Sequence, residues 1–162
     1  MIFAAVGTQK FPMDRLLKEL DRLAGEALVT EEIFAQAGTS GDEPRHYRCS
    51  PFLAQEEMNR YVEACSILIC HAGVGTMLAG LKAGKKVIVV PRRASFGEHV
   101  DDHQLEIAQS FASAGYVKAV EDMAQLHDAI RECETWQPPR FVSNRQRFSE
   151  LVLSLIDDLC LG

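Results

Sequence analysis

The apolar residues of the chain fall into short β-rich runs that alternate with longer stretches of helical spacing. The clearest helical stretch places Leu16, Leu17, Leu20 and Leu23 on one face of an amphipathic helix. The clearest strand is the unbroken run of Val and Ile before Pro91, which is typical of a parallel strand covered on both faces. The same patterns predict strands over 2–6, 32–37, 47–51, 66–70, 86–91 and 116–120. They predict helices over 13–24, 55–65, 75–83, 101–113, 123–132 and 143–161.

Strands and helices therefore alternate along the whole chain. This order is typical of a parallel sheet with helices on both of its faces. The sequence predicts an α/β fold of the Rossmann-like type. A length of 162 residues favours a single domain over residues 1–162 rather than two domains.

Small and polar residues follow the predicted strands. In parallel α/β sheets, ligands bind beyond the carboxyl ends of the strands, close to the point where the strand order reverses. We therefore expect one edge of the sheet to carry the binding site. The segments that reach this edge are 7–9, 36–38, 51–53, 71–76, 91–93 and 98–104.

The strongest chemical signal is a strand, a glycine turn and a helix within the sequence ILICHAGVGTMLAGLKAG. Gly73 and Gly75 would let the backbone approach a ligand closely, and the free N–H groups of the following helix would point at the same spot. Thr76 adds a hydroxyl donor, and His71 at the turn would donate to an anionic oxygen. This arrangement suits a diphosphate, although glycine turns also serve tight packing between a strand and a helix.

Two common nucleotide-binding motifs are missing. The first turn, Gly7-Thr8-Gln9, is not G-x-G-x-x-G, and the glycine turn after the fourth strand has no third glycine at the required spacing. No acidic residue ends a strand about twenty residues later, and no G-x-x-x-x-G-K-[ST] occurs. The sequence thus disfavours a nicotinamide cofactor and a P-loop.

The segment after the fifth strand allows two interpretations. Glu98, His99, Asp102 and His103 offer metal-ligand chemistry, with two histidines four residues apart. The simpler interpretation is a helix N-terminus with acidic residues in its first turn. Asp102 and Gln104 would then bind ligand hydroxyls, and we expect no metal.

Charge and composition narrow the function classes. Seventeen Lys and Arg against 23 Asp and Glu give a net charge of −6, which argues against a protein dedicated to duplex nucleic acid. No apolar run reaches the roughly 18 residues that span a bilayer, and no secretion signal begins the chain, so we expect a cytoplasmic protein. Five cysteines without a C-x-x-C disfavour disulfides and structural zinc. Arg92 and Arg93 would either pair with phosphates or lie in a solvated loop.

The glycine turn HAGVGT, the strand VIVVP and the block DHQLEIA together resemble the C-terminal, donor-binding half of the GT-B glycosyltransferases of family 28. The resemblance runs from Ile2 to about Val120. It extends to small catalytic subunits of two-component enzymes, which make exopolysaccharide in bacteria and lipid-linked chitobiose in eukaryotes. It implies inverting transfer of a hexose from a UDP-sugar to a lipid-linked, polyprenyl diphosphate acceptor, with no metal or other cofactor.

The resemblance also implies which residues bind the donor. Those that would face UDP are Gly7, Thr8, Gln9, Phe52, Leu53, His71, Ala72, Gly73, Val74, Gly75 and Thr76. Those that would face the donor sugar are Glu98, His99, Asp102 and Gln104. Phe52 and Leu53 would line the uracil pocket, and His71 would stabilise the leaving UDP. No catalytic base is assigned, because we expect the partner to supply it.

One position and the chain length depart from a complete enzyme of this kind. Family members commonly hold the ribose with a glutamate three residues after the threonine of the glycine turn, and here Ala79 stands in its place. The chain supplies one of the two Rossmann-like halves of a GT-B enzyme. The resemblance therefore implies a membrane-anchored, acceptor-binding partner, which would hold this chain at the inner face of the membrane. The apolar stripe of the predicted helix 143–161 would pack on the chain's own sheet or dock on that partner.

Two other functions stay open. The alternative is a non-catalytic nucleotide-sugar-binding or regulatory subunit that enhances a partner transferase. An epimerase-type enzyme acting on a UDP-sugar is a weaker alternative, because it would also need a second domain.

Overall fold

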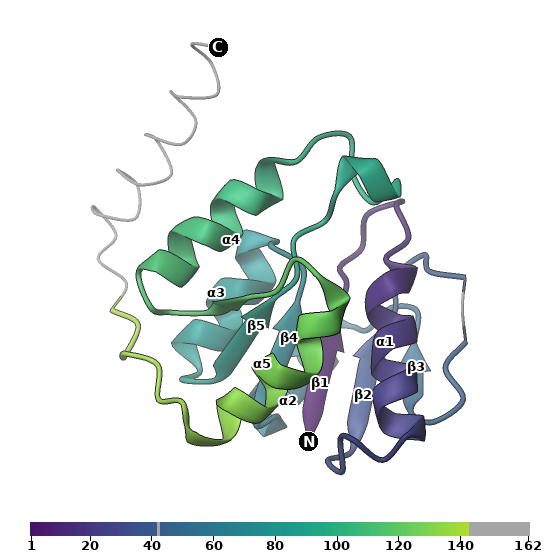
Figure 1. The fold of residues 1–162 in the computed structure, drawn as a ribbon, viewed down its shortest axis with the longest axis horizontal. Coiled ribbons are helices and arrows are strands. Elements are labelled where there is room, and N and C mark those ends of the chain that lie inside the picture. Colours follow the sequence, from purple (N-terminus) through teal and green to yellow (C-terminus); the bar gives the residue numbers. More distant parts are fainter. Residues whose placement is uncertain (42, 143–162) are drawn as a thin grey trace.

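The computed structural model describes residues 1–41 and 43–142, and it confirms the predicted parallel sheet. Six strands lie in the order β3-β2-β1-β4-β5-β6, and all neighbouring pairs are parallel (Figure 1). The strands are β1 Ile2–Ala5, β2 Ile33–Gln36, β3 Arg48–Ser50, β4 Ile67–Cys70, β5 Lys86–Val89 and β6 Lys118–Ala119. Each strand is shorter than the pattern predicted, although flanking residues such as Val6, Ala37 and Val90 still donate backbone hydrogen bonds to the neighbouring strand.

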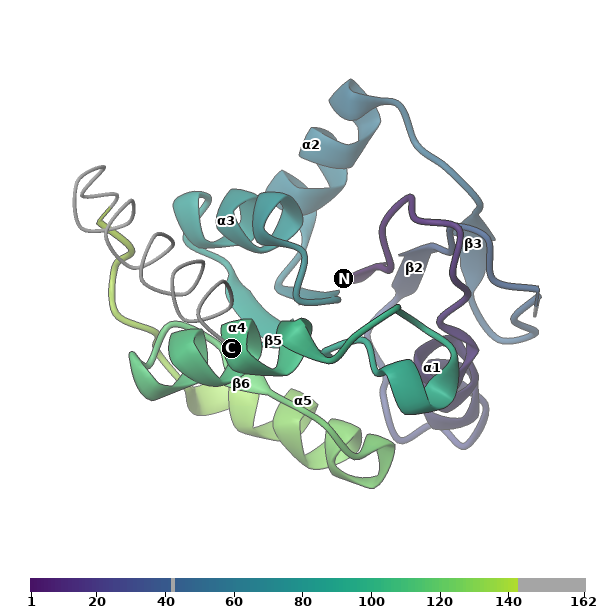
Figure 2. The ribbon, with the colours of Figure 1, turned by 90° about the horizontal axis from the view of Figure 1, so that it is seen from above.

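Helices cover both faces of this sheet. Figure 2 shows α2 and α3 on one side, and α1 and α5 on the other. The helices are α1 Asp14–Gly25, α2 Gln55–Ala64, α3 Val74–Lys82, α4 His103–Ser113 and α5 Leu126–Thr135. Short 3₁₀ turns, η1 Ala94–Phe96 and η2 Met123–Gln125, precede α4 and α5.

The central strand β1 shows why the sheet needs two helical layers. Ile2 and Ala4 lie in the core cluster beneath α1 and α5, whereas Phe3 and Ala5 lie in the cluster beneath α2, α3 and α4. Successive side chains of a strand point to opposite faces. All four side chains are fully buried, so this strand has no polar face and must be covered on both sides.

Two predicted helices begin at other residues in the structure. Helix α4 begins at His103 rather than at residue 101, and its N-cap residue is Asp102. The predicted helix 123–132 is a 3₁₀ turn followed by α5, with Leu126 as the first α-helical residue. The predicted helix 143–161 lies outside the described residues. No helix within the described ranges is long and apolar enough to cross a membrane.

The strand order reverses between β1 and β4. From β1 the chain moves outward to β2 and β3, and it then returns to place β4 on the other side of β1. The loops that leave β1 and β4 consequently diverge at the carboxyl edge of the sheet, at the top of Figure 1. This is the place where open α/β sheets bind ligands.

Candidate functional site

The structure brings Gly7, His71 and Gly73 together at this switch point. Gly7 follows β1 with φ +85°, a conformation that side chains rarely adopt. A Cβ atom at Gly7 would lie 2.6 Å from Cε1 of His71, and a Cβ atom at Gly73 would lie 2.1 Å from its Nε2. The imidazole therefore fills the space that side chains at both glycines would need.

His71 is buried and neutral. Its ring is 8% exposed, and Nδ1 lies 3.4 Å from the carbonyl oxygen of Ala5. Burial lowers its pKa to about 4, and the positive charge of Arg92 adds to this effect. A neutral imidazole that donates from Nδ1 to Ala5 leaves Nε2 as an acceptor. His71 would thus donate to a phosphate oxygen only after it had taken up a proton.

The depressed pKa of His71 predicts a loss of stability in acid. Because the unfolded histidine titrates near 6.5 and the folded one near 4, the unfolded chain binds more protons between these values. We expect the free energy of unfolding to fall by about 2 kcal/mol between about pH 7 and about pH 5. Urea denaturation at both pH values measures the effect. His71→Gln should remove that part of the pH dependence, whereas His127→Gln on α5 should keep it, and equal curves for both variants would contradict the assignment.

The N-terminus of α3 offers free donors next to His71. The amides of Val74, Gly75 and Thr76 have no acceptor among the described residues, since the first bond of this turn runs from Met77 to Gly73. Gly73 is the N-cap residue and provides no side-chain cap. A Cβ atom at Gly75 would have no protein atom within 4 Å. The free amides at the positive end of the helix therefore have room beside them for an anion.

Gln36, at the end of β2, holds the neighbouring loops in place. Its side chain is 3% exposed; Oε1 accepts from the amide of Gly7 at 3.0 Å, and Nε2 donates to the carbonyls of Gly7 at 2.9 Å and Pro51 at 2.8 Å. The sequence placed this glutamine at the binding edge without assigning it a role. The sequence signal that could have identified this role is a polar residue at the end of a buried strand.

The other residues predicted to face UDP lie along the same edge. Thr8 and Gln9 are exposed in the loop after β1. Phe52 is 51% exposed after β3, and Leu53 packs partly against the core cluster beneath α2. Since β2 and β1 separate β3 from β4, a ligand that reached from His71 to Phe52 would cross two strand ends. That spacing is compatible with an extended nucleotide.

Two of the residues predicted to face the donor sugar make internal contacts. Glu98 is 3% exposed; it accepts from Arg15 at 2.7 and 3.1 Å and from the amide of Arg93 at 3.1 Å. Gln104 is equally buried and accepts from the amide of Arg92 at 3.0 Å. For Glu98 to grip a sugar it would have to release Arg15. Contact of these two residues with a sugar stays a prediction.

In the loop after β5, His99 and His103 contact the carboxylate of Asp101, which was not among the predicted metal ligands. The backbone amide of Asp101 donates to His99 Nδ1 at 3.3 Å, and the Asp101 carboxylate lies 3.1 Å from that nitrogen and also contacts His103 Nδ1. Candidate ligand atoms of the three residues lie within 4.8 Å of one another, so they are the described residues that could hold a divalent cation. Asp102 instead accepts from the amide of Ala94 at 2.8 Å. The hydrogen bond from His103 lowers the pKa of Asp101.

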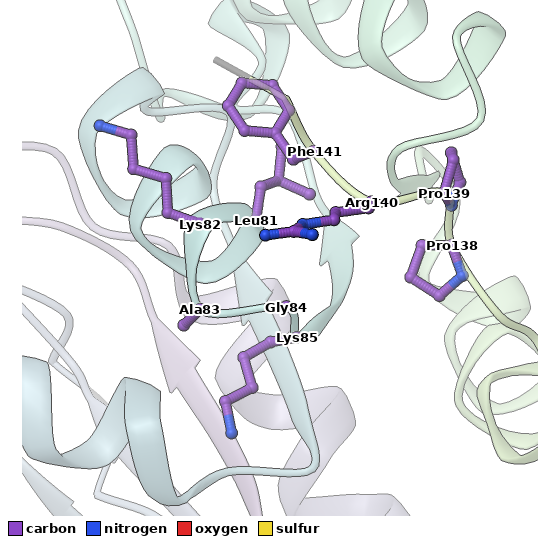
Figure 3. A pocket seen from close by; sticks show the side chains of 9 residues that line it. All are labelled: Leu81, Lys82, Ala83, Gly84, Lys85, Pro138, Pro139, Arg140 and Phe141. Atoms are coloured by element: carbon purple, nitrogen blue, oxygen red, sulfur yellow. The ribbon is translucent and has the colours of Figure 1, made fainter.

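A pocket of about 460 Å³ lies away from this site (Figure 3). It is formed where α3 ends and β5 begins, at the opposite edge of the sheet from His71. Lys82, Lys85 and Arg140 contribute its charges, and Pro138 with Phe141 contributes apolar surface. The pocket is therefore separate from the edge where the glycine turn lies.

Comparisons with known proteins identify the family of this chain. The model of the glycosyltransferase family 28 C-terminal domain matches residues 1–157. The chain is 30% identical over 90 residues to the UDP-N-acetylglucosamine transferase subunit ALG13 of Candida albicans, covering 52% of this chain and 29% of that protein. It is 35% identical over 104 residues to the UDP-N-acetylglucosamine–N-acetylmuramyl-(pentapeptide) pyrophosphoryl-undecaprenol N-acetylglucosamine transferase of Solibacter usitatus, covering 64% of this chain and 26% of that protein. The matches thus span less than a third of these relatives.

Solved structures support the fold. The solution structure of ALG13 superposes with a TM-score of 0.62 at 18% identity, covering 93% of both chains. The crystal structure of Acinetobacter baumannii MurG gives a TM-score of 0.55 at 20% identity, covering 94% of this chain and 49% of that one. At such low identity the likeness is one of fold, and it places this sheet among GT-B halves. The family match extends over nearly the whole chain, and the chain therefore belongs to the family of glycosyltransferase family 28 C-terminal domains.

Proposed function

We propose that this chain is the donor-binding, catalytic subunit of an inverting glycosyltransferase. It would move a hexose from a UDP-sugar to a lipid-linked, polyprenyl diphosphate acceptor in exopolysaccharide or glycolipid synthesis. The observation that carries the proposal is the set of free amides at the start of α3, which opens beside Gly7 and His71 at the switch point. Such amides stabilise the negative charge that develops on a leaving diphosphate.

The relatives support the choice of donor and the need for a partner. The Candida albicans relative is a subunit of a UDP-N-acetylglucosamine transferase, and the Solibacter usitatus relative transfers N-acetylglucosamine to a pyrophosphoryl-undecaprenol acceptor. Three large apolar side chains are exposed on loops at the carboxyl edge: Phe52 at 51%, Phe96 at 59% and Val100 at 73%. We infer that this edge faces a membrane-associated, acceptor-binding subunit, which would hold the chain at the cytoplasmic side of the membrane.

Binding and transfer assays test the proposal together. Calorimetry should rank UDP above ADP and NAD as a ligand of the chain. Hexose transfer from labelled UDP-sugars to a polyprenyl diphosphate-linked acceptor should require both this chain and its partner. Tightest binding of NAD would contradict the proposal. Transfer that survived a Gly75→Val variant unable to bind UDP would instead favour a non-catalytic, regulatory subunit.

We expect transfer to be independent of a metal ion. Backbone amides and the dipole of α3 would carry the charge on UDP, a task for which many transferases use a divalent cation. EDTA should therefore leave the rate of transfer by the reconstituted pair within about twofold of its original value. Loss of activity with EDTA, restored by manganese and abolished again by His103→Ala, would overturn this expectation and assign the metal to the His99–Asp101–His103 cluster.

Ala79 offers a gain-of-function test of the ribose position. It lies one helical turn beyond Gly75, on the same face of α3, and its side chain is partly buried. A carboxylate at this position would accept hydrogen bonds from ribose hydroxyls, so Ala79→Glu should tighten UDP binding by about tenfold. Calorimetry with UDP and with 2′,3′-dideoxy-UDP measures the gain, which should vanish for the second ligand. Ala79→Gln is the control for added volume.

A further inference from the structure

Arg92 is a buried cation directly behind the candidate diphosphate site. It follows β5, and its side chain is the largest of those that are fully buried, with 0% exposure. The sequence allowed two predictions for this residue: that it pairs with phosphates, or that it lies in a solvated loop. The structure contradicts the second prediction, because the side chain is buried. The guanidinium reaches no ligand surface either, so direct pairing with a phosphate would require the surrounding loops to open.

Backbone carbonyls surround the guanidinium. Nη2 donates to Val6 at 2.7 Å, and Nη1 donates to Phe11 at 2.8 Å and to Glu98 at 2.9 Å. The first two carbonyls belong to the loop after β1, and the third belongs to the loop after β5, which lie side by side in Figure 1. Arg92 thereby ties together the two loops that border the switch point.

Among residues 1–41 and 43–142, no carboxylate forms an ion pair or hydrogen bond with the Arg92 side chain. Glu98, whose charge acts on Arg92, is engaged by Arg15 and by the amide of Arg93. Nε of Arg92 is buried without a partner among the described residues. Burial lowers the pKa of Arg92 and Glu98 opposes that shift, but a guanidinium remains charged near neutral pH. Burying a charge without a direct counter-ion costs folding free energy. A function for this charge would account for that cost.

The charge acts on the site itself. Val6, whose carbonyl accepts from Arg92, immediately precedes Gly7. The positive charge of Arg92 is also one of the causes that lower the pKa of His71, which lies next to the free amides at the start of α3. A cation in a poorly solvated position attracts an anion more strongly than a surface cation would.

We propose that Arg92 is a positioning residue that holds the loops after β1 and β5 in register and supplies a fixed positive charge behind the diphosphate of the donor. The inference rests on the proposed function, because it takes the diphosphate to bind at the start of α3. It assigns to Arg92 a share of the discrimination of UDP from uncharged uridine, in addition to the share that the free amides of α3 provide.

The test compares ligands of different charge in matched variants. Arg92→Met should weaken UDP binding by roughly tenfold or more while it changes uridine binding by less than about twofold. Arg92→Lys retains the charge, so it should preserve most of the ratio of UDP to uridine affinity even where both affinities fall. Arg48→Met removes an exposed arginine that pairs with Glu32 and should change neither affinity.

A second readout separates charge from structure. NMR titration of His71 should show a higher pKa in Arg92→Met than in the wild-type chain, because a positive neighbour is lost. Equal loss of UDP and uridine binding in Arg92→Met, with an unchanged His71 pKa, would overturn the proposal and leave a purely structural role.

Failure of the methionine variant to fold leaves Arg92→Lys as the deciding variant. A ratio of UDP to uridine affinity close to that of the wild-type chain would support the proposal, and a collapsed ratio would overturn it. If the wild-type chain binds no UDP, the proposed function fails first, and that outcome is distinct from failure of the Arg92 inference.

Discussion

Glu98→Ala is expected to lower the free energy of unfolding by about 3–5 kcal/mol, because removal of one partner from a buried ion pair leaves the other charge uncompensated. The glutamate is 3% exposed and binds Arg15 with both carboxylate oxygens. Its loss would leave the half-buried Arg15 without its carboxylate partner. Urea denaturation, monitored by far-UV circular dichroism, measures the change.

Glu32→Ala is the matched control for that variant. Glu32 pairs with Arg48 at 2.6 Å, but the two side chains are 58% and 80% exposed. An exposed pair of this kind contributes about 0–1 kcal/mol, so the control should unfold almost like the wild-type chain. Equal stability of the two variants would contradict the structural role of Glu98. If Glu98→Ala stayed stable and lost only transfer activity, the result would instead support the predicted contact between Glu98 and the donor sugar.

Gly75→Val is expected to weaken UDP binding by roughly 100-fold while the chain stays folded. The added side chain would enter the open space above the free amides of α3, where the diphosphate is proposed to lie. Gly75 is the second residue of the helix and is exposed, so the new side chain meets no protein atom at its Cβ. Because glycine is unfavourable within a helix, the free energy of unfolding should stay equal or rise by about 0.5 kcal/mol.

Gly41→Val is the matched control, because a Cβ atom at Gly41 also meets nothing within 4 Å and the residue lies outside the site. It should leave UDP affinity unchanged in calorimetry. Unaltered UDP binding by Gly75→Val would show that the diphosphate does not rest on the start of α3. Gly73→Val is a poorer probe, because its side chain would strike His71 and would disturb folding and binding together.

The fold was largely predictable because its pattern is local. The four leucines of α1 fall at helical spacing, and all four are buried. The strand that begins at Lys86 is an uninterrupted apolar run, and it lies between two other parallel strands. The meeting of Gly7 with His71 follows from the parallel order, since residues that leave adjacent strands reach the same edge.

The contacts made by the polar residues were not predictable in the same way. Arg15 and Glu98 are 83 positions apart, and no local spacing links a helical arginine to a loop glutamate. Sequence patterns also gave no means of distinguishing a buried Arg92 from an exposed one, because its side chain donates to the carbonyls of Val6, Phe11 and Pro12, which lie far away along the chain. The role of Gln36 depends likewise on the positions of one earlier loop, at Gly7, and one later loop, at Pro51.

The imidazole that fills the space of two absent side chains has an evolutionary consequence. Positions 7, 71 and 73 share a single volume, so the residue acceptable at one of them depends on the residues at the other two. Homologous chains with a smaller residue at position 71 would have room for alanine at position 73, whereas position 7 would still favour glycine because of its positive φ. Substitutions at 71 and 73 are therefore expected to arise as pairs during divergence, with 71 changing first.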